Sequence, residues 1–311
     1  MYLAGPMNVS ISGSSGRNPE EEWNKLCLAL QEADAVLVGS GAGLSTAAGL
    51  TYTGERLNLW FGDFLRKYPI PDMYTGGFFA LRLPPEICWA YWARYIYINR
   101  YLDPPKPVYS DLLRILSGKD YFSLTTNVDH CFQKAGFDKN RLFYMQGDYG
   151  LFQTVDGRNG KTYDNEAWVM QAMAAQGFQK DETGILRVPE DGSLRMELPT
   201  ELIPTCPDDG SAVTMNLRAD ASFVEDAGWH AANARYEEFL RTHETGRVLY
   251  LELGVGANTP VIIKYPFWQR TLQNPDSTYA CLNYGEAFAP DPIRDRSIFL
   301  DADIAEVLAN L

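Results

Sequence analysis

Residues 35–43 of this chain read AVLVGSGAG, and this stretch decides the fold. Four apolar residues in a row are typical of a strand that is buried on both faces of a sheet. The glycines that follow allow the backbone to turn sharply, and a helical pattern resumes at Leu44. A strand, a glycine-rich turn and a helix in this order predict one repeat of an α/β sheet.

Further strands and helices alternate along the chain. We predict strands at residues 121–125, 142–145, 248–253 and 279–283, and helices over residues 20–32 and from Asn127 to Ala135. Strands that alternate with helices indicate a parallel sheet, because each crossover connection carries a helix. The predicted fold class is therefore α/β.

Two stretches interrupt this alternation. Residues 53–105 are dense in aromatic side chains and predict packed helices, whereas residues 148–230 contain turn pairs such as Asp156-Gly157 and predict short hairpins. Residues 1–18 are polar and rich in glycine and serine, which predicts a disordered leader. We predict a sheet domain made of residues 19–52, 106–147 and 231–311, a helical insertion at 53–105 and a small lobe at 148–230.

Composition excludes several classes of function. The 311 residues are 46% apolar, which is enough for a sizeable core, and they carry a net charge of −13. A chain of this charge is repelled by nucleic acids and by anionic membranes, so neither is a predicted partner. The five cysteines are scattered and never spaced as CxxC, which favours a reduced, cytoplasmic chain without disulfides.

The glycine-rich turn has two possible meanings. Gly39, Gly41 and Gly43 would let the backbone approach a pyrophosphate, whose charge free N–H groups and a helix N-terminus stabilise. Such turns also occur for packing alone, and the spacing departs from the usual G-x-G-x-x-G. The turn by itself leaves both interpretations open.

Four motifs together carry a family resemblance. Residues 41–50, GAGLSTAAGL, resemble the sirtuin signature G-A-G-x-S-x-x-x-G-I, and residues 125–129, TTNVD, resemble T-Q-N-I-D. Residues 253–260, LGVGANTP, are similar to G-T-S-x-x-V-x-P, and residues 281–283 resemble the I-N strand on the adenosine side. The motifs follow the family's order. The resemblance implies a Rossmann-like, NAD-binding sheet domain.

The resemblance also implies a set of site residues. Asn127 would position the ribose hydroxyls of NAD, and Asp129 would hold the nicotinamide carboxamide. Simpler alternatives are a helix cap for Asn127, a carboxylate at a helix start for Asp129, and a hydrogen bond within its own helix for Ser45. The implied cofactor-binding residues are Gly41, Ala42, Gly43, Ser45, Tyr52, Arg56, Thr126, Asn127, Val128, Asp129, Gln146, Gly254, Val255, Gly256, Asn258 and Asn283.

One departure from the family changes the expected chemistry. Gln146 stands where deacylating sirtuins have a histidine that acts as general base. An amide can hold a ribose hydroxyl, but it does not accept a proton near neutral pH. His130 is the nearest substitute, yet on a helix it would point about 100° away from Asp129. We therefore predict a catalytic set of Asn127, Asp129 and Gln146 that lacks the deacetylase base.

The small lobe departs from the family as well. Sirtuins usually carry four zinc thiolates there, and Cys206-Pro207-Asp208-Asp209-Gly210 resembles one zinc knuckle whose second cysteine is replaced by Asp209. A structural zinc site needs four ligands, so we predict no metal in this lobe. The lobe would instead fold on the apolar packing of Leu198, Leu202, Ile203, Met215 and Leu217.

Residues 146–150, QGDYG, resemble the class M branch of the sirtuins, as do residues 52–56, 215–218 and 223–226. That branch implies transfer of ADP-ribose from NAD to a protein acceptor with release of nicotinamide, and the acceptor it implies is a lipoylated carrier protein. Arg218 and Glu225 would then line an acceptor cleft, or they are simply paired surface charges. The alternatives are a protein deacylase, a non-catalytic sensor of NAD or ADP-ribose, and an NAD hydrolase.

Overall fold

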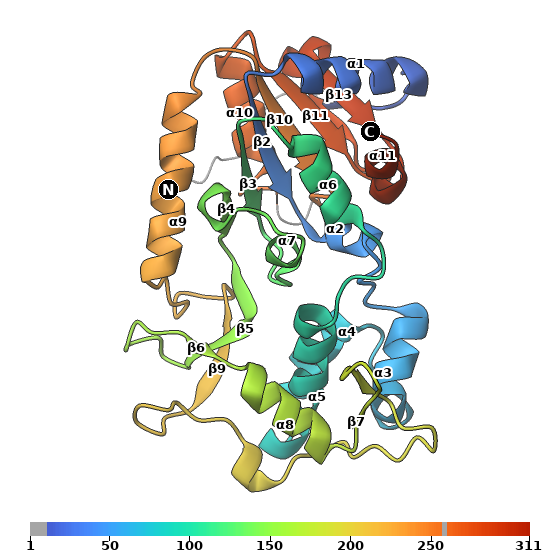
Figure 1. The fold of residues 1–311 in the computed structure, drawn as a ribbon, viewed down its shortest axis with the longest axis vertical. Helices are drawn as coiled ribbons and strands as arrows, with labels where there is room; N and C mark the ends of the chain where they lie inside the picture. Colours follow the sequence, from blue (N-terminus) through green and yellow to red (C-terminus); the bar gives the residue numbers. More distant parts are fainter. Residues whose placement is uncertain (1–10, 257–259) are drawn as a thin grey trace. The chain divides into compact units, whose positions relative to one another are not determined.

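The structure, a computed structural model, describes residues 11–256 and 260–311 (Figure 1). These residues form two compact units. Unit 1 comprises the described residues of Met1–Gly49, Pro104–Gln146 and Ala227–Leu311. Unit 2 comprises Leu50–Asp103 and Gly147–Asp226. The chain therefore passes from unit 1 into unit 2 and back twice.

Unit 1 is built on a six-stranded parallel sheet in the order β13-β11-β10-β2-β3-β4 (Figure 1). Numbered along the chain, the order is 3-2-1-4-5-6, which is that of a Rossmann sheet. The parallel α/β fold expected from the sequence is confirmed, and β13 is an additional strand. The strands are β2 (Ala35–Ser40), β3 (Tyr121–Thr125), β4 (Leu142–Tyr144), β10 (Val248–Leu253), β11 (Thr278–Leu282) and β13 (Ser297–Leu300).

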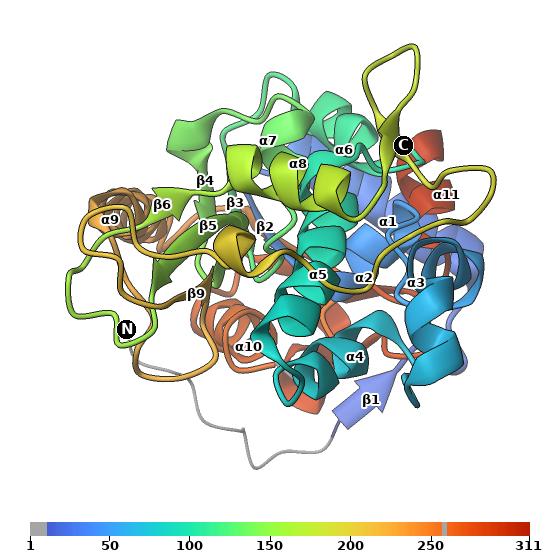
Figure 2. The same cartoon turned by 90° about the horizontal axis from the view of Figure 1, so that it is seen from below.

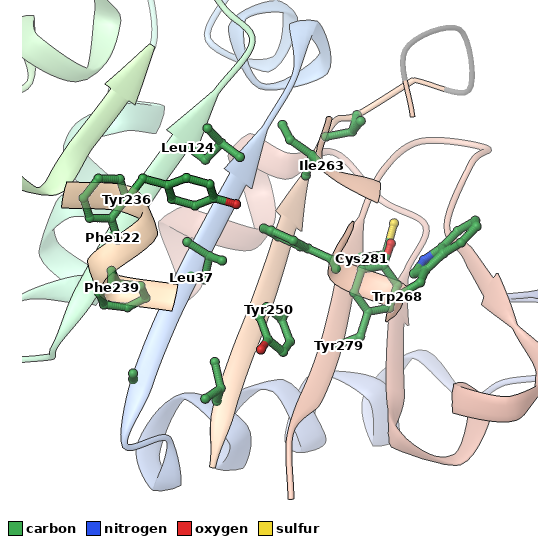
Figure 3. Packing of buried hydrophobic residues seen from close by; sticks show 14 of the residues in the cluster. Leu37, Phe122, Leu124, Tyr236, Phe239, Tyr250, Ile263, Trp268, Tyr279 and Cys281 are labelled. Carbon is green, nitrogen blue, oxygen red and sulfur yellow. The ribbon is translucent and has the colours of Figure 1, made fainter. Parts of the chain in front are cut away.

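Helices cover both faces of this sheet (Figure 1). On one face, the rings of Tyr236 and Phe239 from α9 pack against Phe122, and Trp268 of α10 belongs to the same core as Tyr279 (Figure 3). On the other face, α1 contacts β13 and α6 contacts α11. The helices of unit 1 are α1 (Pro19–Glu32), α2 (Ala42–Ala47), α6 (Val108–Leu116), α7 (Cys131–Lys134), α9 (Ala227–Thr242), α10 (Lys264–Gln273), α11 (Ile304–Asn310) and the 3₁₀ turns η2 (Lys139–Arg141) and η4 (Asp291–Arg296).

Residues 11–18 are ordered, unlike the disordered leader expected over residues 1–18. Strand β1 (Ile11–Gly13) pairs antiparallel with β12 (Phe288–Pro290). The Arg17 guanidinium donates to the carbonyl oxygens of Ser297, at 2.6 Å, and Arg294, at 2.8 Å. These contacts tie the segment to the end of the sheet, while residues 1–10 of the expected leader lie outside the described residues.

The helix expected from Asn127 to Ala135 begins four residues later, at Cys131. His130 has a left-handed backbone with φ of 65°, which no right-handed helix accommodates. Residues 126–130 form a loop in which Thr125 Oγ1 accepts from the Asn127 amide at 3.0 Å. Asn127 is therefore not a helix cap, and the helical geometry assumed for His130 and Asp129 is wrong.

Unit 2 combines the helices expected over residues 53–105 with the lobe at 148–230. Figure 2 shows α5 beside α4 and α8, which it contacts. A three-stranded antiparallel sheet has the order β6-β5-β9, and β7 pairs with β8. The elements are α3 (Gly54–Lys67), α4 (Met73–Ala80), α5 (Pro85–Ile96), the π-helical turn η1 (Tyr97–Tyr101), β5 (Gly147–Thr154), β6 (Tyr163–Asp164), α8 (Glu166–Ala175), β7 (Gln179–Lys180), β8 (Leu186–Arg187), η3 (Thr200–Leu202) and β9 (Val213–Leu217).

One arginine joins these two insertions. Arg94 of α5 is fully buried, and its guanidinium forms two hydrogen bonds to the Asp63 carboxylate, at 2.6 and 2.8 Å. It also donates to the side chain of Gln176, at 2.7 Å, and to the carbonyl oxygens of Trp60 and Arg195. These bonds use all five guanidinium N–H groups. The two insertions therefore share one core.

The turn at Cys206 is held by hydrogen bonds. The Cys206 amide donates to the Ser211 carbonyl, and the Gly210 amide donates to the Cys206 carbonyl, both at 2.8 Å. The Cys206 thiol lies 3.4 Å from the Tyr163 hydroxyl. In the part of the chain that the structure describes, no group of three or more His, Cys, Asp or Glu side chains lies together to hold a metal ion. That this lobe holds no metal stays a prediction. Of the apolar residues expected to form its core, Leu198 and Met215 are buried, whereas Leu202, Ile203 and Leu217 are half-buried.

Across the described residues, no helix combines the length and the apolar character that a bilayer crossing requires.

Candidate functional site

The residues expected to form a site follow the carboxyl ends of neighbouring strands in unit 1. Ser40, the last residue of β2, is in register with Leu253 of β10 and Thr125 of β3. Because the strands are parallel, the loops that follow them share one edge of the sheet. The strand order reverses between β2 and β10, because β3 and β4 follow β2 on one side while β10, β11 and β13 extend the sheet on the other. Ligands of such sheets bind at this switch point. The residues at this edge are Gly41, Ala42, Gly43, Ser45, Thr126, Asn127, Val128, Asp129, Gln146, Gly254, Val255, Gly256 and Asn283.

Glycines bring the loops after β2 and β10 into backbone contact. The Gly43 amide donates to the Gly254 carbonyl at 2.9 Å. A Cβ atom on Gly43 would lie 2.7 Å from the Gly254 Cα, and one on Gly41 would lie 2.8 Å from the Gly254 oxygen. Gly254 has a φ of 62°, which only glycine adopts without strain. We call Gly41, Gly43 and Gly254 the glycine cradle.

Gly39 has a different role. A Cβ atom there would lie 2.3 Å from the side chain of Ile263 and 2.6 Å from that of Phe267. Gly39 therefore allows α10 to pack closely on β2. Of the two meanings left open for the glycine-rich turn, packing accounts for Gly39, and close approach of two loops at the sheet edge accounts for Gly41 and Gly43.

Ser45 and Asp129 form a buried hydrogen-bonded pair. The Ser45 hydroxyl donates to Asp129 Oδ2 at 2.5 Å and lies 2.9 Å from the Tyr109 hydroxyl. Asp129 Oδ1 accepts from the Cys131 amide at 3.0 Å. Burial, followed by the nearby Asp129 charge, raises the pKa of Tyr109 well above its ordinary value, so its hydroxyl is neutral. Ser45 thus bonds across to the loop after β3 and not within its own helix.

Asn127 joins the loop after β3 to the loop after β2. Its side-chain amide donates to the Gly41 carbonyl at 2.9 Å and lies 3.4 Å from the Tyr109 hydroxyl. Its Oδ1 atom accepts no hydrogen bond from any residue within 11–256 or 260–311. The half-buried side chain therefore has an acceptor to offer at the sheet edge.

Gln146 lies two residues beyond β4, where the chain leaves unit 1. The residue before it is fixed on two sides, because the Met145 amide donates to the Thr125 carbonyl and Trp229 Nε1 donates to the Met145 carbonyl at 3.0 Å. The Gln146 side chain is half-buried and makes no hydrogen bond to the residues that the structure describes. It is a neutral amide with both its donor and its acceptor available.

A buried charged cluster lies just before the cradle and was not expected from the sequence. Glu252 and Lys264 are almost completely buried, and Lys264 Nζ lies 2.5 Å from Glu252 Oε1. The Tyr279 hydroxyl donates to Glu252 Oε2 at 2.7 Å. Burial raises the pKa of Cys281 to about 12, so this neutral thiol also donates to Glu252. The cluster anchors β10 and the start of α10 on either side of the loop at Gly254–Gly256.

The remaining expected site residues lie in unit 2 or outside the described residues. The Arg56 guanidinium donates to Asn99 Oδ1 at 3.0 Å and to the Ile98 carbonyl at 2.5 Å, both within unit 2. The Tyr52 ring lies 5.8 Å from the Tyr95 ring. Asn258 is outside the described residues.

The two residues expected to line an acceptor cleft form an ion pair with each other, in which Arg218 Nη2 lies 2.5 Å from Glu225 Oε1. Of the two interpretations, the structure contains the paired surface charges. The Arg218 guanidinium also lies over the Phe223 ring, 4.3 Å from its centre.

Replacing Ser45 with alanine is expected to lower the free energy of unfolding by about 1.5–3 kcal/mol, because it leaves a buried carboxylate oxygen of Asp129 without its donor. Urea titration measures this loss. Thr46→Ala, on the exposed side of the same short helix, should change stability by no more than about 0.5 kcal/mol. Equal effects of the two substitutions would show that the Ser45–Asp129 bond does not hold the loop.

Comparison of the amino-acid sequence with known proteins found relatives of this chain. No family model matches it. The chain is 36% identical over 282 residues to the "Protein ADP-ribosyltransferase" of Staphylococcus aureus, with 90% of this chain and 84% of that protein aligned. It is 28% identical over 273 residues to a "Probable bifunctional ADP-ribose hydrolase/ADP-ribosyltransferase" of Fusarium oxysporum, of which it spans 42%.

Solved structures share the fold. A Sir2 protein with a p53 peptide and NAD⁺ matches 92% of this chain with a TM-score of 0.53 and 18% identity, and 95% of that chain is covered. Sir2Tm bound to a propionylated peptide matches to the same extent with a TM-score of 0.51. At this identity the likeness shows the fold alone. With the Rossmann strand order and the 36% identity to the staphylococcal enzyme, the chain belongs to the sirtuin-type protein ADP-ribosyltransferases, which use NAD.

Proposed function

We propose that this protein transfers ADP-ribose from NAD to a lipoylated carrier protein and releases nicotinamide. The observation that carries the proposal is Gln146, a neutral amide with no hydrogen-bond partner among the described residues, at the sheet edge where deacylating sirtuins have a histidine base. Residues 146–150, QGDYG, favour the class M branch, whose implied acceptors are lipoylated carriers. The identity to the staphylococcal protein supports ADP-ribosyl transfer in general.

The glycine cradle would hold the pyrophosphate of NAD. Gly41 and Gly43 leave no side chain at the switch point, and a Cβ atom at either position would collide with the loop at Gly254. These glycines fix the two loops against each other at the switch point, which is where dinucleotides bind Rossmann sheets. Bound NAD supplies a glycosidic bond whose cleavage frees nicotinamide. Ala42, Thr126, Val128, Val255, Gly256 and Asn283 would line the same edge. Tyr52 and Arg56 of unit 2, and Asn258 outside the described residues, stay predictions from the sequence.

Asn127 and Asp129 would orient the nicotinamide end. The free Oδ1 of Asn127 would accept from a ribose hydroxyl, because its amide group is already held by the Gly41 carbonyl. Each carboxylate oxygen of Asp129 accepts one hydrogen bond, Oδ2 from the Ser45 hydroxyl and Oδ1 from the Cys131 amide. An ionised carboxylate has about four acceptor sites, so capacity remains for the N–H groups of a carboxamide. Both side chains would therefore bind while staying fixed in place.

Gln146 would hold a ribose hydroxyl without taking its proton. An amide does not act as a base near neutral pH, so this residue neither activates that hydroxyl for deacylation nor generates hydroxide from water. The attacking nucleophile must then come from a bound acceptor. This requirement favours transfer to a protein over deacylation and over hydrolysis of NAD.

Weighing an intact carrier protein tests the acceptor. With NAD and enzyme, the lipoylated carrier should gain the mass of one ADP-ribose, and the same carrier without its lipoyl group should gain far less. Gln146→Ala should slow the transfer about tenfold, the effect of losing one positioned hydrogen bond. Equal labelling of both carrier forms would refute the lipoyl requirement, and no labelling of either would refute this class of acceptor.

A further inference from the structure

Three exposed apolar side chains gather on helix α4 and on the residue that directly follows it. Tyr74, Phe78 and Leu81 are 57%, 55% and 59% exposed. Their spacing of four and three residues places them on one helical face, and the Tyr74 and Phe78 rings lie 5.1 Å apart. Only eight large apolar side chains in the described part of the chain are exposed to this degree, so three within eight residues form a distinct apolar stripe.

The opposite side of α4 fixes the direction in which this stripe points. A Cβ atom on Gly76 would lie 2.3 Å from the Tyr91 hydroxyl, and one on Gly77 would lie 2.9 Å from the Trp92 ring. The Tyr91 hydroxyl donates to the Met73 carbonyl at 2.8 Å. The two glycines thus let α4 pack tightly on α5, and the helix cannot rotate to bury its apolar stripe.

Basic residues lie close to the stripe in the sequence. Residues 66–86 contain three cations, Arg66, Lys67 and Arg82, and two acids, Asp72 and Glu86, which gives a local charge of +1 in a chain of −13. The Asp72 carboxylate is used to cap α4, where it accepts from the Thr75 amide and hydroxyl at 2.7 Å. None of the three cations forms an ion pair with the residues described at 11–256 and 260–311.

Contacts within unit 2 connect two of these cations, Lys67 and Arg82, to α4. The Lys67 ammonium lies 5.3 Å from the centre of the Tyr68 ring, and that ring lies 5.6 Å from the Phe79 ring of α4. The Arg82 amide donates to the Phe79 carbonyl at 3.0 Å. We call the stripe and its cations, Arg66, Lys67, Tyr74, Phe78, Leu81 and Arg82, the α4 surface.

We propose that the α4 surface docks the protein acceptor and that this acceptor presents acidic side chains around an apolar spot; this rests on the proposed function. An aromatic centre with a charged rim is the usual composition of a protein interface. The net charge of −13 repels an acidic protein from most of the molecule, so a local positive surface selects where it binds. The same net charge opposes docking of a second copy.

Two paired substitutions test the surface, with a lipoylated carrier protein of net negative charge as the probe. Arg66→Glu with Lys67→Glu should raise KM for the carrier about tenfold and flatten its dependence on salt, because electrostatic steering is reversed. Tyr74→Ser with Phe78→Ser should raise the same KM at any salt concentration. In both, kcat and KM for NAD should be unchanged. Matched controls are Lys180→Glu in β7 and Leu28→Ser in α1, both exposed, which should leave every constant unchanged.

Each other result counts against the proposal. An unchanged carrier KM in both double variants overturns it. So does self-association of the wild type that Tyr74→Ser with Phe78→Ser abolishes in sedimentation, or binding to phosphatidylserine vesicles that Arg66→Glu with Lys67→Glu abolishes. If the wild type labels no carrier, the proposed function fails, and a binding titration with the same carrier tests the surface alone. Binding lost in the variants then supports the surface, and no binding by the wild type overturns it.

Discussion

Replacing Arg94 with methionine is expected to lower the free energy of unfolding by about 3–5 kcal/mol, because it leaves the Asp63 carboxylate without its buried partner. Arg94→Lys should recover only part of this loss, since an ammonium cannot reproduce five hydrogen bonds in a planar fork. Urea titration followed by tryptophan fluorescence measures the effect. Four of the seven tryptophans, Trp60, Trp89, Trp92 and Trp168, belong to unit 2.

A surface arginine of the same unit provides the control. Arg187 pairs with Asp181 at 2.8 Å, but both side chains are in contact with solvent. Arg187→Met should leave the unfolding midpoint where it is, because exposed ion pairs contribute little. A loss below about 1 kcal/mol in Arg94→Met would contradict the view that this arginine joins the two insertions into one core.

Replacing Gly43 with alanine is expected to lower kcat/KM for NAD about 100-fold, the cost of moving a binding loop by about an ångström. The added Cβ atom would lie 2.7 Å from the Gly254 Cα, so the loops after β2 and β10 must separate. Steady-state kinetics with NAD as the varied substrate measures the effect. A thermal melt of the same sample checks that unit 1 remains folded.

Gly62→Ala is the matched control, because a Cβ atom there approaches only the end of the Arg66 side chain, at 3.7 Å. It should leave kcat/KM for NAD unchanged and stabilise α3 slightly. If Gly43→Ala stays folded and keeps its affinity for NAD within about twofold of the wild type, the glycine cradle is not the NAD site. If Gly43→Ala does not fold, the same measurement is made on Gly41→Ala, whose Cβ atom would lie 2.8 Å from the Gly254 oxygen of the same loop.

Much of the sheet of unit 1 could be predicted from the sequence, since five of its six strands are apolar runs followed by turns. Residues 35–40 and 248–253 are buried at every position, which is the burial that continuous apolar runs indicate. Strand β13 escaped prediction because no α-helix separates it from β11, so it stands outside the alternation of strands and helices that identified the other five.

The loop after β3 could not be predicted, because its conformation depends on distant residues. Local pattern favours a helix from Asn127, but Ser45, 84 residues earlier, holds Asp129, and Gly41 holds the Asn127 side chain. His130 is left-handed although it is not a glycine. Tertiary hydrogen bonds therefore override local helix propensity here. Tyr109, whose hydroxyl lies beside the side chains of both Ser45 and Asn127, carries no sequence signal that separates it from the chain's other tyrosines.

The buried charged cluster around Glu252 and Lys264 was missed, although a charged residue within an apolar strand was a signal for it. Glu252 lies in the run VLYLEL, where its neighbours are apolar, and a glutamate is almost never fully buried without a partner. That pattern predicts a buried cation, but it does not identify which one. Lys264 is twelve residues away and reaches Glu252 because α10 packs on β2 through Gly39.

Nicotinamide release, measured together with label transfer from NAD carrying a radioactive adenosine, tests the central claim most directly. With enzyme, NAD and a lipoylated carrier, one nicotinamide should appear for each label that becomes protein-bound, and neither should appear when the acceptor is left out. Nicotinamide released into water with free labelled ADP-ribose, or label recovered on an acyl-ADP-ribose after addition of an acylated peptide, would contradict an enzyme whose Gln146 orients the sugar without moving a proton.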